Sequence, residues 1–144
     1  SEVFKAFKEN DKEQVIASHT GYKGVQHIRE FIFERSKEEI IIHDTINVLD
    51  EELHTIFIPF HLSPDIVISR ESDNKFCLKN SDQICVYLTL DDILDPIITN
   101  GSLDPILGWN SESFLKKTPS PVIHAEIKTN KNILLITKIK IHEY

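Results

Sequence analysis

Histidine is the residue type with the clearest capacity for chemistry in this sequence, because its imidazole binds metals and transfers protons near neutral pH. The chain contains seven, at His19, His27, His43, His54, His61, His124 and His142. They are scattered through the chain, and none shows the two- or three-residue separation of paired metal ligands. A metal site built from His19, Asp44 and His61 would need separate strands to converge. We therefore expect no metal ligand and no cofactor.

Other catalytic patterns are weaker still. The sequence has no glycine loop with a phosphate-binding lysine, no Gly-x-Ser-x-Gly turn, and no cysteine paired with a histidine. Its paired carboxylates, Asp91-Asp92 and Glu38-Glu39, fall in predicted turns, where solvated charge is the simplest interpretation. The residues taken alone predict a structural or binding module without catalytic residues.

Composition points to a folded domain with little affinity for nucleic acid. The 144 residues are 40% hydrophobic and 27% charged, which is typical of one globular domain. The net charge of -7 disfavours nucleic acid, whose phosphates require clustered cations. A basic groove in the last third stays an alternative to a solvated strand face; its lysines are Lys116, Lys117, Lys128, Lys131, Lys138 and Lys140.

The ends and the cysteines carry further expectations. The longest apolar runs, such as Ile133–Ile136, are far shorter than the roughly 20 residues of a membrane span, and no secretory signal is visible at the N-terminus. Because the sequence has no Met and starts at Ser1, we expect a piece of a larger protein. Its compartment, periplasmic or cytoplasmic, stays open. Cys77 and Cys85 could face each other across a hairpin, but we expect two free, partly buried thiols.

Alternation of apolar and polar residues at period two organises the chain. It predicts strands over residues 26–35, 53–62 and 133–141, and Pro59 indicates an edge or a bulge in the second. In the third, Lys138 and Lys140 face away from the apolar side, as in a half-exposed strand. Shorter strands are expected over residues 13–19, 39–45, 65–70, 75–78, 83–90 and 121–128.

Turn residues separate these strands about every ten residues, as in an antiparallel sandwich or barrel. They include Thr20-Gly21, Ser72-Asp73-Asn74, Asn80-Ser81-Asp82, Asn100-Gly101 and Thr129-Asn130. At most one short helix is expected; the candidate is Ser1–Lys12, which fits a strand equally well. We predict an all-β antiparallel sandwich forming a single domain over residues 1–144.

Several short motifs, in order along nearly the whole chain, resemble one family. They are the segment Ala17–Tyr22, then His27-Ile28-Arg29, then Ile40–Asp44, Phe60-His61-Leu62-Ser63-Pro64 and Gly108-Trp109-Asn110-Ser111, followed by Pro119-Ser120 and a last strand bearing Thr137. Together they are similar to the C-terminal β-sandwich of heparinase II/III-like proteins. The resemblance implies a supersandwich-like fold and a fragment of a larger, bacterial protein.

The resemblance also implies a reaction for the parent protein. Polysaccharide lyases of this kind cleave chains containing uronic acid by β-elimination, removing the proton on C5 beside the carboxylate. In the family, the catalytic groups come from an N-terminal α/α-toroid and the first part of the β-region, which includes a His-x-His element and a structural metal site. We expect this chain to begin after those elements, and it contains no His-x-His. No catalytic or metal residue is carried over from the family.

Four residues are candidates for contact with a polysaccharide: Tyr22, His27, Arg29 and Trp109. The alternative for each is structural. Gly21 would then provide a turn with positive φ, the Tyr22 hydroxyl would anchor a corner, and Arg29 would pair with Glu30 or Asp44. Trp109 would close one end of the sandwich.

The leading hypothesis is a non-catalytic C-terminal sandwich of a heparinase II/III-like lyase, whose partners are the N-terminal toroid of the same chain and an acidic polysaccharide. An independent carbohydrate-binding module would need an exposed aromatic platform, for which Trp109, Tyr22, Tyr87 and Phe114 are the available residues. A plain structural or assembly domain in surface-polysaccharide metabolism would instead show an uncovered apolar face.

Overall fold

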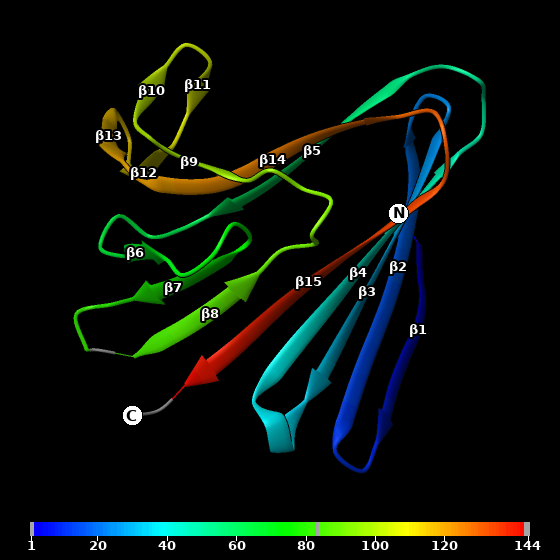
Figure 1. Ribbon diagram of the computed structural model, residues 1–144, viewed down its shortest axis with the longest axis horizontal. Helices are drawn as coiled ribbons and strands as arrows, with labels where there is room; N and C mark the ends of the chain where they lie inside the picture. The colour runs from blue at the N-terminus through cyan, green and yellow to red at the C-terminus, as the bar shows by residue number, and fades with distance from the viewer. Residues whose placement is uncertain (1, 83, 143–144) are drawn as a thin grey trace.

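The protein is built from antiparallel strands, as the period-two pattern predicts (Figure 1). The computed structural model describes residues 2–82 and 84–142. Within these residues the strands form one large sheet, one small sheet and two hairpins. The expectation of an all-β sandwich is confirmed.

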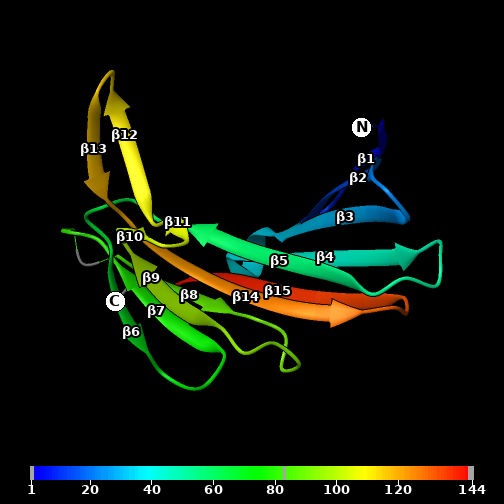
Figure 2. The same ribbon diagram turned by 90° about the horizontal axis from the view of Figure 1, so that it is seen from above.

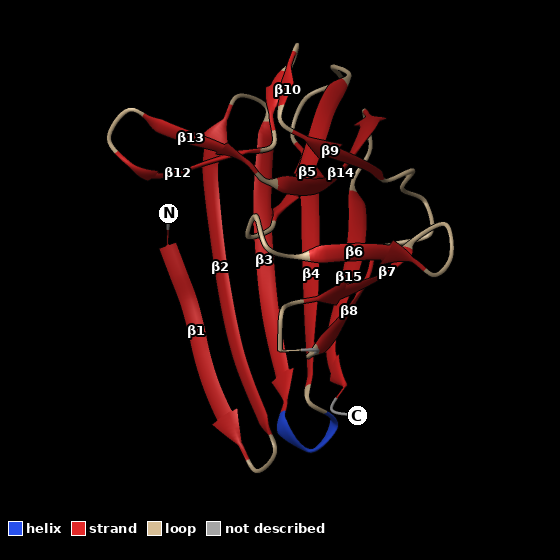
Figure 3. Ribbon diagram, turned by 90° about the vertical axis from the view of Figure 1, so that its left-hand side faces the viewer, coloured by secondary structure: helices blue, strands red, loops and turns tan. Residues whose placement is uncertain are grey.

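Eight strands form the large sheet, in the order β1-β2-β3-β4-β15-β8-β7-β6. Their bounds are β1 (Glu2–Glu9), β2 (Lys12–Tyr22), β3 (Val25–Glu34), β4 (Glu39–Val48), β6 (Val67–Arg70), β7 (Lys75–Lys79), β8 (Cys85–Thr89) and β15 (Ile133–His142). A 3-10 turn, η1 (Arg35–Lys37), joins β3 to β4 and is the blue segment in Figure 3. The last strand of the chain thus lies in the middle of the sheet, beside β4 and β8.

Three strands form the small sheet, in the order β5-β14-β9. They are β5 (His54–His61), β14 (Pro121–Thr129) and β9 (Ile97–Asn100). In Figure 1 they cross the upper part of the large sheet, while β1 to β4 extend below them. Because β5 is an edge strand, Pro59 sits where a missing backbone N–H is tolerated, and the edge expected from this proline is confirmed.

The hydrophobic core lies between the two sheets. Phe76, Leu88 and Leu135 enter it from the large sheet, and Ile58 and Ile123 enter it from the small sheet. All five are buried. On β15 the alternation predicted from the sequence holds, because Leu135 faces the core whereas Lys138 and Lys140 are exposed on the other face.

Two short hairpins were not predicted from the sequence. Between β9 and β14, β10 (Ser102–Leu103) pairs with β11 (Ile106–Leu107), and β12 (Trp109–Ser113) pairs with β13 (Lys116–Pro119). In this region we expected only the turn at Asn100-Gly101. Figure 2 shows that the β12–β13 hairpin projects away from both sheets.

The N-terminal segment is a strand, so the helical interpretation of Ser1–Lys12 is wrong. Residues Glu2–Glu9 form β1, which pairs with β2 along its length. Pairing with a neighbouring strand here outweighs a weak helical spacing in a segment without a cap.

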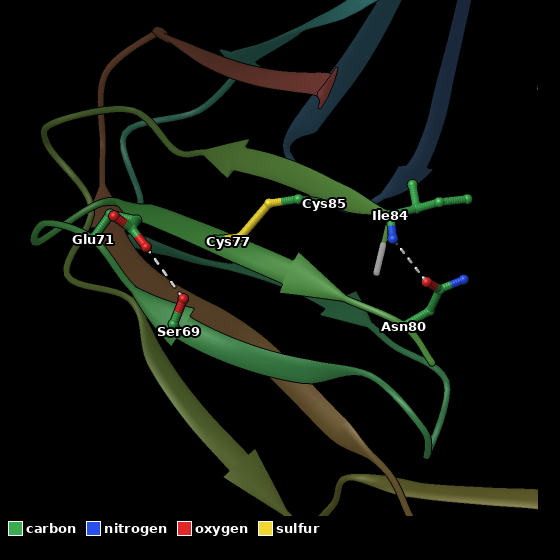
Figure 4. Close-up of a disulfide and its surroundings, with 6 residues drawn as sticks. All are labelled: Ser69, Glu71, Cys77, Asn80, Ile84 and Cys85. Carbon is green, nitrogen blue, oxygen red and sulfur yellow. Dashed lines mark hydrogen bonds between the residues drawn. A yellow bond between two sulfur atoms is a disulfide. The ribbon is translucent and has the colours of Figure 1, made fainter. Parts of the chain in front are cut away.

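The expectation of free thiols is also wrong, because Cys77 and Cys85 form a disulfide (Figure 4). Cys77 lies on β7 and Cys85 begins the adjacent strand β8. Their Cα atoms are 6.2 Å apart, within the distance that a disulfide spans. Both residues are buried.

Candidate functional site

A cavity of about 880 Å³ lies between β5 and the inner face of strands β2, β3 and β4. The register of β3 places its site residues here: Arg29 is opposite Asp44 and His27 is opposite Ile46 on β4. Side chains on a strand alternate between faces, so His27, Arg29 and Asp44 share one face. The polar lining comprises His19, Tyr22, Lys23, His27, Arg29, Asp44, His54 and Thr55.

Asp44 is the centre of the polar cluster and is only 5% exposed. The Arg29 guanidinium donates from Nε to Oδ1 at 2.6 Å and from Nη2 to Oδ2 at 3.0 Å. His27 Nε2 donates to Oδ1 at 2.6 Å. Both carboxylate oxygens are therefore occupied, and Asp44 acts as an anchor for the Arg29 and His27 side chains rather than as a free base.

The pKa of Asp44 is lowered from its ordinary value. Burial is the largest influence and by itself raises the pKa, because it disfavours the charged form. The hydrogen bonds from His27 and Arg29, with the charge of Arg29, together outweigh it. The carboxylate is ionised at neutral pH, and the alternative in which Arg29 pairs with Asp44 is confirmed.

Tyr22 lies at the end of β2, in the wall of the cavity, and is 63% exposed. Its ring centroid is 4.9 Å from that of His19, and the His19 ring meets His27 edge-on at 5.5 Å. The expected corner anchored by the Tyr22 hydroxyl is wrong, because a residue this exposed does not anchor a packed corner. An exposed phenol beside imidazole and guanidinium groups is able to stack on a sugar ring and donate a hydrogen bond.

The turn that orients Tyr22 is formed by Lys23 and Gly24, since Tyr22 pairs with Val25 across it. Gly24 has φ +71, and a Cβ there would lie 1.8 Å from Asp50 Oδ2. The positive φ expected at Gly21 is therefore found three residues later. Gly24 is required both for the backbone conformation and for the approach of the Asp50 carboxylate.

A second carboxylate–imidazole pair lies at this end of the cavity. His54 Nε2 is 2.7 Å from Asp50 Oδ1, and this hydrogen bond is the main cause that lowers the pKa of Asp50. This pair was not predicted from the sequence. The only local signal was the four-residue separation of Asp50 and His54. That separation brings the two side chains together only when the chain turns between them.

The opposite face of the large sheet carries a separate polar group. His43 Nδ1 is 2.7 Å from Glu30 Oε2, and the Gln14 amide donates to the same carboxylate. His43 and Asp44 thus point to opposite faces, as expected for adjacent strand residues. These three side chains do not line the cavity.

The structure brings together three of the four residues predicted to contact polysaccharide. Tyr22, His27 and Arg29 all line the cavity, whereas Trp109 lies at the base of the β12–β13 hairpin. Trp109 Nε1 donates to the Ser102 carbonyl at 2.7 Å, and Lys117 Nζ is 3.8 Å from the centre of its ring. These contacts give Trp109 a structural role at one end of the sandwich.

Within residues 2–82 and 84–142, no group of three or more His, Cys, Asp or Glu side chains is arranged to hold a metal ion. His19 and Asp44 line the cavity, but His61 does not. In the same part of the chain, no helix is both long and apolar enough to cross a membrane.

The sequence of residues 1–136 matches the family described as heparinase II/III-like, C-terminal. The chain belongs to this family. The resemblance of the short motifs is thereby confirmed. No curated protein is similar enough in sequence to match the chain.

Solved structures of a heparan sulfate lyase and of a heparinase III share the fold. A heparan sulfate lyase, HepC from Pedobacter heparinus, superposes with a TM-score of 0.78 at 11% identity over 99% of this chain. A heparinase III, the BT4657 gene product, gives a TM-score of 0.77 at 16% identity over 99% of this chain. This heparinase II/III-like chain spans only 22% and 21% of the length of those two structures.

Proposed function

We propose that this chain is the non-catalytic C-terminal β-sandwich of a polysaccharide lyase that cleaves chains containing uronic acid by β-elimination. The observation that carries the proposal is the state of the cavity. Its central carboxylate, Asp44, is bound at both oxygens by Arg29 and His27. A carboxylate held in this way positions other side chains and does not accept a substrate proton.

The proposed reaction is demanding. A base removes the C5 proton, the C4–O bond breaks, a C4=C5 double bond forms, and the leaving oxygen takes a proton. The uronate carboxylate must be neutralised throughout. We assign these roles to an N-terminal domain of the same polypeptide, in keeping with the small share of the lyase structures that this chain covers.

The supporting role that we propose is contact with the polysaccharide at the mouth of the cavity. Tyr22 would stack on a sugar ring, and His27 and the Arg29 guanidinium, both held by Asp44, would form a wall of hydrogen-bond donors behind it. Trp109 is a weaker candidate for contact with a sugar, because Lys117 already lies over its ring. An independent carbohydrate-binding module is less favoured, since Tyr22 and Trp109 lie in different parts of the molecule.

The test is a lyase assay that follows the absorbance of the unsaturated uronate product. Residues 1–144 and the full-length polypeptide are compared on heparan sulfate, chondroitin sulfate, hyaluronan and alginate. We expect activity in the full-length polypeptide and none in residues 1–144. Activity of the isolated chain would refute the proposal.

A matched pair of variants tests the substrate contact. In the full-length polypeptide, Tyr22→Ala should raise KM several-fold, whereas Val67→Ala, a change at a similarly exposed residue on β6, should not. An unchanged KM in the Tyr22→Ala variant would exclude a sugar contact at this position.

A further inference from the structure

The tip of the β12–β13 hairpin carries the two most exposed large apolar side chains among the described residues. Phe114 and Leu115 form the two-residue turn between Ser113 and Lys116, and each is 93% exposed. Single exposed apolar residues are common on protein surfaces, but two adjacent ones at the end of a projecting hairpin are not. Figure 2 shows this hairpin standing clear of the sandwich.

The backbone conformation of the turn is unfavourable for the leucine at its second position. Leu115 has φ +63, in the left-handed region that Gly or Asn adopts at low cost and that a bulky side chain disfavours. A sequence chosen for turn stability alone would have Gly or Asn there. Leucine at this position indicates that an apolar side chain at the tip has a use beyond the turn.

Hydrogen bonds tie the base of the hairpin to the neighbouring segments of the chain. The Gly108 carbonyl accepts hydrogen bonds from the backbone of Gly101 and of Ser120, both at 2.8 Å. Gly108 has φ +77, and a Cβ there would lie 2.8 Å from the Gly101 nitrogen. Trp109 closes the base through its bond to Ser102.

We propose that the Phe114–Leu115 tip inserts into an apolar pocket on the N-terminal domain of the same polypeptide and locks the sandwich against it. The inference rests on the proposed function, because that domain is the proposed catalytic one. The solved structures that share the fold contain several times more polypeptide than this chain, and the proposed pocket would lie on the corresponding part of this protein. An anionic membrane is disfavoured, since the chain carries a net charge of -7.

The test uses the full-length polypeptide with a specific protease site introduced before residue 1. After cleavage, the retention of residues 1–144 by the remainder is measured by size-exclusion chromatography over a dilution series. Burial of both apolar side chains predicts that a Phe114→Ser, Leu115→Gly double variant binds at least a hundredfold more weakly than the wild type.

The single variant Leu115→Gly separates docking from folding, because the two effects have opposite signs. Glycine relieves the positive φ, so the thermal midpoint of residues 1–144 should stay the same or rise. Retention should nevertheless weaken about tenfold. Leu53→Gly, in the exposed loop before β5, is the matched control and should leave retention unchanged.

Retention of the double variant at the wild-type level would overturn the proposal, as would self-association of residues 1–144 that depends on Phe114 and Leu115. Lyase activity of the uncut polypeptide is measured in parallel. If the uncut polypeptide has no lyase activity but the double variant still weakens retention, the proposed reaction is refuted and the docking stands. If the polypeptide is active but the double variant is retained like the wild type, only the docking is refuted.

Discussion

Replacing Asp44 with Asn should destabilise the protein by about 2–4 kcal/mol at neutral pH. The change keeps the shape of the side chain but removes the charge that receives two bonds from Arg29 and one from His27. A hydrogen bond to a charged group contributes about 1.5–3 kcal/mol. The expected loss is smaller than the sum of the three hydrogen bonds, because the Arg29 side chain is 40% exposed and is solvated when its partner is removed.

The effect should depend on pH with a definite sign. The pKa of Asp44 is lower in the folded protein than its ordinary value of 3.8. Its contribution to stability is therefore fully present above that value and is lost as the pH falls through the lowered folded pKa. The difference in unfolding free energy between wild type and Asp44→Asn should shrink as the solution is acidified below the ordinary value.

Urea unfolding at 25 °C, followed by circular dichroism, measures both effects. The two proteins are compared at about pH 7 and again at about pH 3. Asp92→Asn, at an exposed position in the loop after β8, is the control and should change stability little. A loss below about 0.5 kcal/mol for Asp44→Asn at neutral pH would refute the view that this carboxylate anchors the cavity.

Two further perturbations test the rest of the fold. Cys77→Ser should lower the unfolding free energy by about 2–3 kcal/mol, as expected for a disulfide between residues of sequence separation 8. A reductant should produce the same loss in the wild type but none in the variant. Equal stability of the oxidised and reduced wild type would contradict this prediction. Gly108→Ala should lower the unfolding free energy by about 2–3 kcal/mol, because φ at this residue is +77 and a Cβ would lie within 3.0 Å of two backbone atoms. Gly21→Ala, where the nearest atom to a Cβ is at 3.5 Å, is the control and should change the thermal midpoint little. Similar midpoints for the two variants would show that the backbone contacts at Gly108 tolerate a side chain.

The strands with strong alternation were predictable because their pattern is local. Residues 26–35, 53–62 and 133–141 became β3, β5 and β15 with small shifts at their ends. In β5 and β15 one face packs on the core and the other does not, whereas one face of β3 lines the cavity. The short strands β9 to β13 escaped because they contain few consecutive alternating residues and are stabilised by contacts at Gly101, Gly108 and Trp109.

The cavity was predictable only in its parts. Tyr22, His27 and Arg29 stood out by residue type, and the pairing of β3 with β4 could be expected from their order in the chain. Strand register decides that Arg29 meets Asp44, because a shift of one residue would turn the side chain to the other face. The pair of His54 and Asp50 depends instead on the turn before β5, and the place of Trp109 depends on the separate β12–β13 hairpin.

The sequence by itself determined the all-β class, the alternating strands and the family, because periodicity and short motifs are properties of neighbouring residues. Only the tertiary structure decided which carboxylate binds Arg29, that Cys77 and Cys85 join, and that Phe114 and Leu115 stand exposed at the tip of a hairpin. The Arg29–Asp44 pair and the Cys77–Cys85 disulfide depend on which residues of adjacent strands lie side by side, and the position of the hairpin depends on the backbone bonds between Gly101, Gly108 and Ser120 at its base. Local sequence patterns do not encode the register of strand pairing.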